Sequence, residues 1–103
     1  DWARIVALYD ALAELAPTPV VALNRAVAVS MHTGPADGLA LVDALVDAPA
    51  LRSYHLLPAV RGDLLHKLGR GEEARAEFLR AAEMTRNARE RGLLLARADA
   101  ALA

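Results

Sequence analysis

Residues 55–86 contain small and large apolar residues at the spacing that two closely packed antiparallel helices require. Helices approach closely only where the facing side chains are small, and Gly62 and Ala74 would supply that contact. A glycine between the two segments can adopt the positive φ that ends the first helix. The pattern therefore predicts a helical hairpin with the signature residues Gly62, Leu65, Gly69, Ala74, Phe78 and Ala81.

The composition favours the same kind of fold. The 103 residues are enough for one domain at most, and 55% of them are hydrophobic while only 4% are aromatic. A core made of Ala, Leu and Val favours closely packed helices over a sheet. We therefore expect an all-α fold.

Charge and cysteine content exclude several functions. The net charge of −1 gives no general attraction to nucleic acid or to an anionic membrane. There is no cysteine for a disulfide or a thiolate zinc site, and no apolar stretch of the about 18 residues that span a membrane. With no signal peptide visible, we expect a cytoplasmic location, no membrane partner and no direct nucleic-acid binding by this chain.

Apolar periodicity interrupted by turn residues predicts six helices. Prolines in segments 17–19 and 48–50, and glycines in segments 32–35 and 69–71, separate the periodic stretches. Asn87, followed three residues later by a glutamate, predicts a capping box for the last helix. The expected helices cover residues 2–15, 20–31, 36–47, 54–68, 72–85 and 87–102.

An internal repeat relates these helices. An offset of 36 residues places Arg25 on Arg61 and Val42 on Phe78. This period and the small-residue positions resemble those of the tetratricopeptide (TPR) repeat, whose period is about 34 residues. The resemblance implies TPR-like antiparallel helical hairpins, with about six helices in a short right-handed solenoid, and an interaction scaffold rather than an enzyme.

The resemblance also sets the expected domain organisation, a single TPR-like domain over residues 1–103. The repeat-like units are expected at about 19–50 and 55–86, with capping helices at about 2–16 and 88–102. The first helix resembles the second helix of a repeat, because it carries Ile5, Tyr9 and Leu12 at the spacing of the Ala, Phe and Ala positions.

Catalytic, metal and cofactor sites are not predicted. The three histidines, His32, His55 and His66, are too scattered along the helices for an obvious ligand set. Neither serine lies on a nucleophile-elbow pattern, and the glycines at 69 and 71 are explained by the turn between helices. We expect no enzyme activity and no cofactor.

Polar pairs recur within two otherwise apolar helices and raise two interpretations. Arg25 and Arg61 could each pair with a carboxylate, from Asp10, Asp43 or Asp63, and so fix the register of the helices. Alternatively, polar residues could line a partner-binding groove. The candidate groove residues are Asn24, Arg25, Tyr54, His55, Arg61 and Asp63.

Four segments resemble the C-terminal extension of one group of bacterial RNA polymerase sigma factors, the extracytoplasmic-function (ECF) type with TPR-like repeats. These segments are DWARIVALYDAL, PTPVVALNRAVAV, GPADGLALVDAL and YHLLPAVRGDLLHKLGR, and together they cover most of the chain. The resemblance implies a regulatory domain that modulates transcription initiation. Its expected partners are the protein's own upstream sigma domains, the RNA polymerase core, or both, with the DNA- and polymerase-binding domains upstream of Asp1.

Two other functions are compatible with the sequence. The chain could be a general TPR adaptor that binds a peptide or protein partner. It could also be a small-molecule sensor with a pocket between the Asn24–Arg25 and Tyr54–His55 helices.

Overall fold

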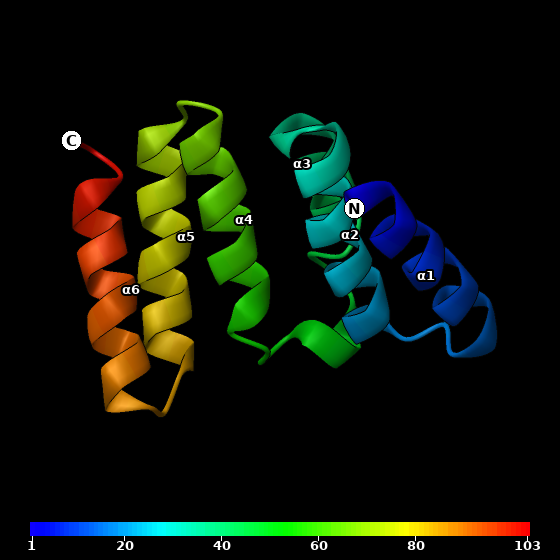
Figure 1. Cartoon of the computed structure of the whole chain (residues 1–103). Coiled ribbons are helices and arrows are strands. Elements are labelled where there is room, and N and C mark those ends of the chain that lie inside the picture. Colours follow the sequence, from blue (N-terminus) through cyan, green and yellow to red (C-terminus); the bar gives the residue numbers. More distant parts are fainter. The chain divides into compact units, whose positions relative to one another are not determined.

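The computed structural model describes all 103 residues and is all-α, with no strand. This confirms the expected fold class and the expected number of helices. None of the helices is both long and apolar enough to cross a membrane. The elements are α1 (Trp2–Leu15), α2 (Pro19–Thr33), α3 (Pro35–Asp43), the short 3-10 helix η1 (Pro49–Leu51), α4 (Leu56–Lys67), α5 (Gly71–Met84) and α6 (Ala88–Ala100) (Figure 1).

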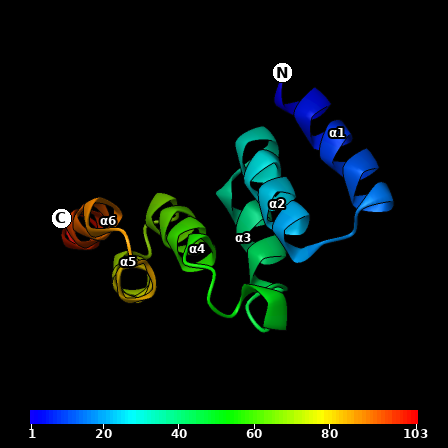
Figure 2. The same ribbon diagram turned by 90° about the horizontal axis from the view of Figure 1, so that it is seen from below.

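The helices form two compact units, which are described separately. The N-terminal unit, Asp1–Arg52, contains α1 to α3, and α2 packs against both α1 and α3. The C-terminal unit, Ser53–Ala103, contains α4 to α6, and α5 packs against both α4 and α6. Figure 2 views α5 and α6 close to end-on, with α4 and α6 on either side of α5.

Two of the helices, α2 and α6, begin with a side-chain cap. Thr18 Oγ1 accepts a hydrogen bond from the Val21 amide at 3.2 Å, and Pro19 occupies the first turn of α2, where its missing N–H costs nothing. Asn87 Oδ1 accepts from the Glu90 amide at 2.9 Å. The predicted Asn87 cap is therefore confirmed, while the Glu90 carboxylate pairs elsewhere.

The turn between α4 and α5 depends on Gly69, whose φ is 76°. The Gly69 amide donates to His66 O at 3.0 Å, and the Arg70 amide donates to Leu65 O at 2.9 Å. These two bonds satisfy carbonyls that the end of α4 would otherwise leave unpaired, in the arrangement known as a Schellman motif. The left-handed conformation strains any residue with a side chain, which explains the glycine.

The close contact between α4 and α5 involves Gly62, as the sequence predicts, but the side chain nearest to Gly62 is that of Phe78 and not that of Ala74. A Cβ atom on Gly62 would lie 2.9 Å from Cε1 of Phe78, so only glycine allows this approach. Phe78 is 2% exposed, and Leu65 and Ala74 are fully buried around it. The N-terminal unit has a similar contact, because a Cβ on Gly38 would overlap Ser30 of α2.

One helix boundary differs from the sequence prediction by more than two residues. We expect a helix to residue 47, but α3 ends at Asp43. After that residue the amide of Leu45 bonds to Val42 O at 2.8 Å and the amide of Ala48 bonds to Leu45 O at 3.0 Å, both three residues back. The chain thus tightens into turns ahead of Pro49, which disfavours the α conformation of the residue before it.

The close contact at Gly38 predicts that two Gly→Ala substitutions in helices change the free energy of unfolding in opposite directions. Gly38→Ala should lower the free energy of unfolding by about 1–3 kcal/mol, because the added methyl group overlaps Ser30. Gly92→Ala, in α6, should raise it by about 0.5–1 kcal/mol, since nothing lies within 4 Å of the added Cβ and alanine is the better helix former. Urea denaturation of both variants provides the measurement. Equal effects would contradict the packing of α2 on α3.

The start of α5 predicts a response of one carboxyl group to pH. Arg70 donates to Glu73 through Nε at 2.9 Å and through Nη2 at 2.7 Å. This hydrogen bonding lowers the pKa of Glu73 below its ordinary value of 4.5. A lowered folded-state pKa means that the stabilisation is present above the unfolded-state pKa and is lost as pH falls through the folded-state value.

Arg70→Gln should therefore raise the pKa of Glu73 towards its ordinary value, as measured by an NMR titration of the side-chain carboxyl carbon. Arg75→Gln is the control, because Arg75 is an exposed arginine of the same helix. A pKa of Glu73 that is unchanged by Arg70→Gln would contradict the bidentate contact.

Candidate functional site

A groove of about 350 Å³ lies between α4 and α6 in the C-terminal unit. The side chains of Ala59 and Leu94 are buried at its base, while Leu56 and Leu93 are 42% and 59% exposed along its sides. Exposed leucines beside a hollow are apolar surface that a partner can remove from water. We call this the α4–α6 groove, lined by His55, Leu56, Ala59, Glu90, Leu93, Leu94 and Arg97.

A histidine–glutamate pair joins the two helices at the N-terminal end of the α4–α6 groove. His55 Nε2 lies 2.6 Å from Glu90 Oε2, and the pair is ionic when the imidazole is protonated. The Thr85 hydroxyl lies 3.4 Å from the same oxygen. Glu90 also follows the Asn87 cap, so the helix start sets the direction of its side chain. This end of the groove therefore presents polar groups held at fixed positions.

Arg97 marks the other end of the groove. Its Nη2 donates to Asp63 Oδ1 at 2.9 Å, and its Cζ lies 4.6 Å from the centroid of the Phe78 ring. Lys67 Nζ lies 3.0 Å from the second carboxylate oxygen of Asp63. A guanidinium over an aromatic face gains about 0.5–1 kcal/mol at exposed sites. Arg97 is thus positioned before any partner binds, with part of its charge still in water.

One of the four predicted groove residues of the C-terminal unit lines this groove. His55 lines it, and Asp63 holds Arg97. The ring centroid of Tyr54 lies 6.3 Å from that of His55. Arg61 reaches across to Glu77 of α5, with Nη1 3.6 Å from Oε1. His55 therefore lines the α4–α6 groove, while Tyr54 and Asp63 lie next to residues of its lining. Arg61 joins α4 to α5 instead.

The other two predicted groove residues lie on α2 of the N-terminal unit. Asn24 is exposed. Arg25 Nε donates to Asp10 Oδ1 at 2.5 Å and so links α2 to α1. Asp10 is one of the carboxylates that the sequence offers for this pair. The side chains of Arg25 and Asp10 are 34% and 53% exposed, and ion pairs that are exposed to water contribute little to stability.

Sequence reasoning missed the α6 side of the groove, namely Glu90, Leu93, Leu94 and Arg97. A usable signal was present. His55 and Asp63 are separated by about two helical turns, and so are Glu90 and Arg97, with charges of opposite sign. Two parallel helices with these spacings can pair at both ends. Segment 86–97 contains four arginines, and this excess of positive charge drew attention away from the pairing of Glu90 and Arg97 with α4.

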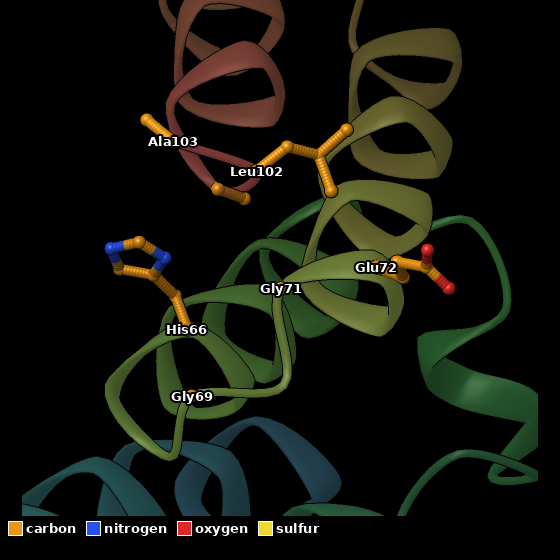
Figure 3. A pocket seen from close by; sticks show the side chains of 7 residues that line it. His66, Gly69, Gly71, Glu72, Leu102 and Ala103 are labelled. Carbon is orange, nitrogen blue, oxygen red and sulfur yellow. The ribbon is translucent and has the colours of Figure 1, made fainter.

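A larger hollow, of about 540 Å³, lies at the turn between α4 and α5. It is lined by His66, Gly69, Gly71, Glu72 and residues 101–103. In Figure 3 the side chains of His66 and Glu72 lie on opposite sides of it, so they do not converge on a common point. This arrangement offers no set of groups that could act together on a ligand.

No group of three or more His, Asp or Glu side chains is placed to hold a metal ion. His32 belongs to the N-terminal unit, whereas His55 and His66 lie at opposite ends of the α4 segment.

Comparison with known proteins finds a relative that matches most of the chain. Over 90 residues, or 87% of its length, the chain is 49% identical to an uncharacterized protein of Rhizobium meliloti (strain 1021). The match covers 21% of that protein, so the chain spans about a fifth of the length of the curated relative. No family model and no solved structure matches the chain.

The contact between Asp63 and Arg97 predicts a measurable coupling. In a double-mutant cycle of Asp63→Asn and Arg97→Gln, the coupling free energy should be about 0.5–1 kcal/mol, because the pair is half-exposed but oriented by Phe78. The pair Asp63 and Lys67 is the matched control, and about 0.3–0.5 kcal/mol is expected for this exposed i,i+4 contact. Strictly additive effects of Asp63→Asn and Arg97→Gln would contradict the contact.

Proposed function

We propose that this chain is a regulatory protein-interaction domain of an ECF-type RNA polymerase sigma factor. The domain modulates transcription initiation through contacts with the sigma domains of its own polypeptide or with the polymerase core. The four segments that resemble such extensions support the sigma-factor assignment. The α4–α6 groove is the single structural observation that carries the interaction role.

The packing of the C-terminal unit supports a TPR-like arrangement of this domain. The glycine contact at Gly62, the turn at Gly69 and the buried Ala74 and Ala81 occupy the positions that such a repeat assigns to small residues. In a stack of helical hairpins, alternate helices line one surface, and α4 and α6 are alternate helices on either side of α5. The α4–α6 groove lies on that surface.

The lining of the groove specifies the chemistry of the partner segment. The base and sides accept an apolar side chain, because Ala59 and Leu94 lie beneath it and Leu56 and Leu93 beside it. Arg97 favours a carboxylate or carbonyl group at one end. Leu93 and Leu94 precede Arg97 by about one helical turn, so the contacted segment of the sigma factor or of polymerase carries an apolar residue with an acceptor about one helical turn away.

A general adaptor remains the second candidate, because the same groove would accept such a segment from an unrelated protein. The two functions differ in whether transcription responds to the groove.

The test is transcription from a cognate promoter in vitro, with purified polymerase and the sigma factor that contains this chain. Leu93→Glu places a charge in the α4–α6 groove and should reproduce most of the effect of deleting residues 1–103. Loss of transcription would make the domain an activating element, and a gain would make it a built-in inhibitor.

Leu102→Glu is the matched control, because Leu102 is 56% exposed, compared with 59% for Leu93, and lies outside the groove. This variant should transcribe like the natural protein. A deletion without effect would overturn the sigma-factor proposal and leave the adaptor. If the deletion changes transcription but Leu93→Glu does not, the contact lies outside the groove.

A further inference from the structure

The first helix carries an apolar face that its own unit leaves partly exposed. No residue of α1 is buried, and Leu8, Leu12 and Leu15 are 65%, 41% and 85% exposed. α1 packs against α2, and Figure 1 shows it beside α2 at the edge of the N-terminal unit. Ile5 and Tyr9 are partly buried in this unit. Four of its residues surround a hollow of about 340 Å³, and we call them the α1 face: Ile5, Leu8, Tyr9 and Leu12.

α1 corresponds residue for residue to α5. An offset that places Trp2 on Gly71 also places Leu15 on Met84, so the two helices begin and end at equivalent positions. The same offset places the α2 cap, Thr18, on the α6 cap, Asn87. In both caps the side-chain oxygen accepts the backbone N–H three residues later. The α1–α2 hairpin is therefore built like the α5–α6 hairpin.

The equivalent face of α5 is covered by α4. The residues that correspond to Ile5, Tyr9 and Leu12 are Ala74, Phe78 and Ala81, all almost completely buried. Gly62 of α4 contacts Phe78, and Arg61 of α4 contacts Glu77. α1 has the face but no helix in the position of α4.

We propose that the α1 face is the docking surface for an amphipathic helix of the same polypeptide, which packs on α1 as α4 packs on α5. The docked helix carries a small residue opposite Tyr9, as Gly62 lies opposite Phe78. The residue just before this small residue is apolar. It corresponds to Arg61, which pairs with Glu77 of α5, and in α1 the position of Glu77 is occupied by Leu8.

Two observations favour this source of the helix over a second copy of the chain. The helix with the required face, α4, is already packed against α5 and is not free to dock on another molecule. The relative from Rhizobium meliloti is about five times as long as the matched segment, so a protein of this kind has further chain from which such a helix can come.

The experiment uses a single thiol and a grafted helix. The chain has no cysteine, so Leu8→Cys supplies a unique reporter of the α1 face. A second copy of residues 54–70, carrying Arg61→Leu, replaces Asp1. The copy of α4 then precedes Trp2 by the same number of residues as α4 precedes Gly71. Alkylation of the thiol should slow by about tenfold or more on grafting, and the melting temperature should rise.

The matched control is the same graft with Gly62→Leu, whose side chain would collide with Tyr9, and here the thiol should react as fast as in the ungrafted chain. If Leu8→Cys perturbs folding, Leu12→Cys reports on the same face. A graft that leaves the alkylation rate unchanged overturns the proposal. Protection of the ungrafted thiol that increases with protein concentration also overturns it, because the occupant is then a second copy.

Discussion

The contact of Phe78 with Gly62 is the interaction on which the C-terminal unit depends. Because Gly62 has no side chain, α4 approaches α5 closely enough for the Phe78 ring to be almost completely buried. The ring in turn lies beneath the Arg97 guanidinium, which holds α6 near α4 through Asp63. One missing Cβ therefore sets the separation of α4 and α5 and, through Phe78 and Arg97, the width of the α4–α6 groove.

The groove combines a rigid base with adaptable ends. Ala59 and Leu94 are buried and make dispersion contacts that a partner would not disturb. Arg97, by contrast, is held by an ion pair with Asp63, and Glu90 by a contact with His55 that is ionic only when the imidazole is protonated. The side chains of both pairs are partly exposed to water, and exposed ion pairs contribute at most about 1 kcal/mol each. A partner can exchange its own polar groups for these pairs at small cost, while specificity for an apolar residue is retained at the base.

The sequence allowed most of the fold to be predicted, because its signals are local. Gly69 in the turn, Asn87 at a helix start and the prolines between helices act within a few residues, and the structure contains each of them as expected. The predicted end of α3 was wrong by four residues, because the chain forms turns ahead of Pro49 in place of the last turn of the helix. The α6 side of the groove was missed for a different reason. His55 and Glu90 meet only because both helices pack on α5, and that relation is not local in the chain.

The correspondence of α1 with α5 changes how the apolar surface of α1 is understood. On an isolated helix, exposed Leu8 and Leu12 would be a liability for solubility. On a helix whose counterpart is covered by α4, the same residues are half of an interface. The different residues at one equivalent position, Leu8 and Glu77, show that the two interfaces are not interchangeable. An ion pair joins α4 to α5, whereas an apolar contact is required on α1, and this difference would keep α4 and the docked helix from exchanging places.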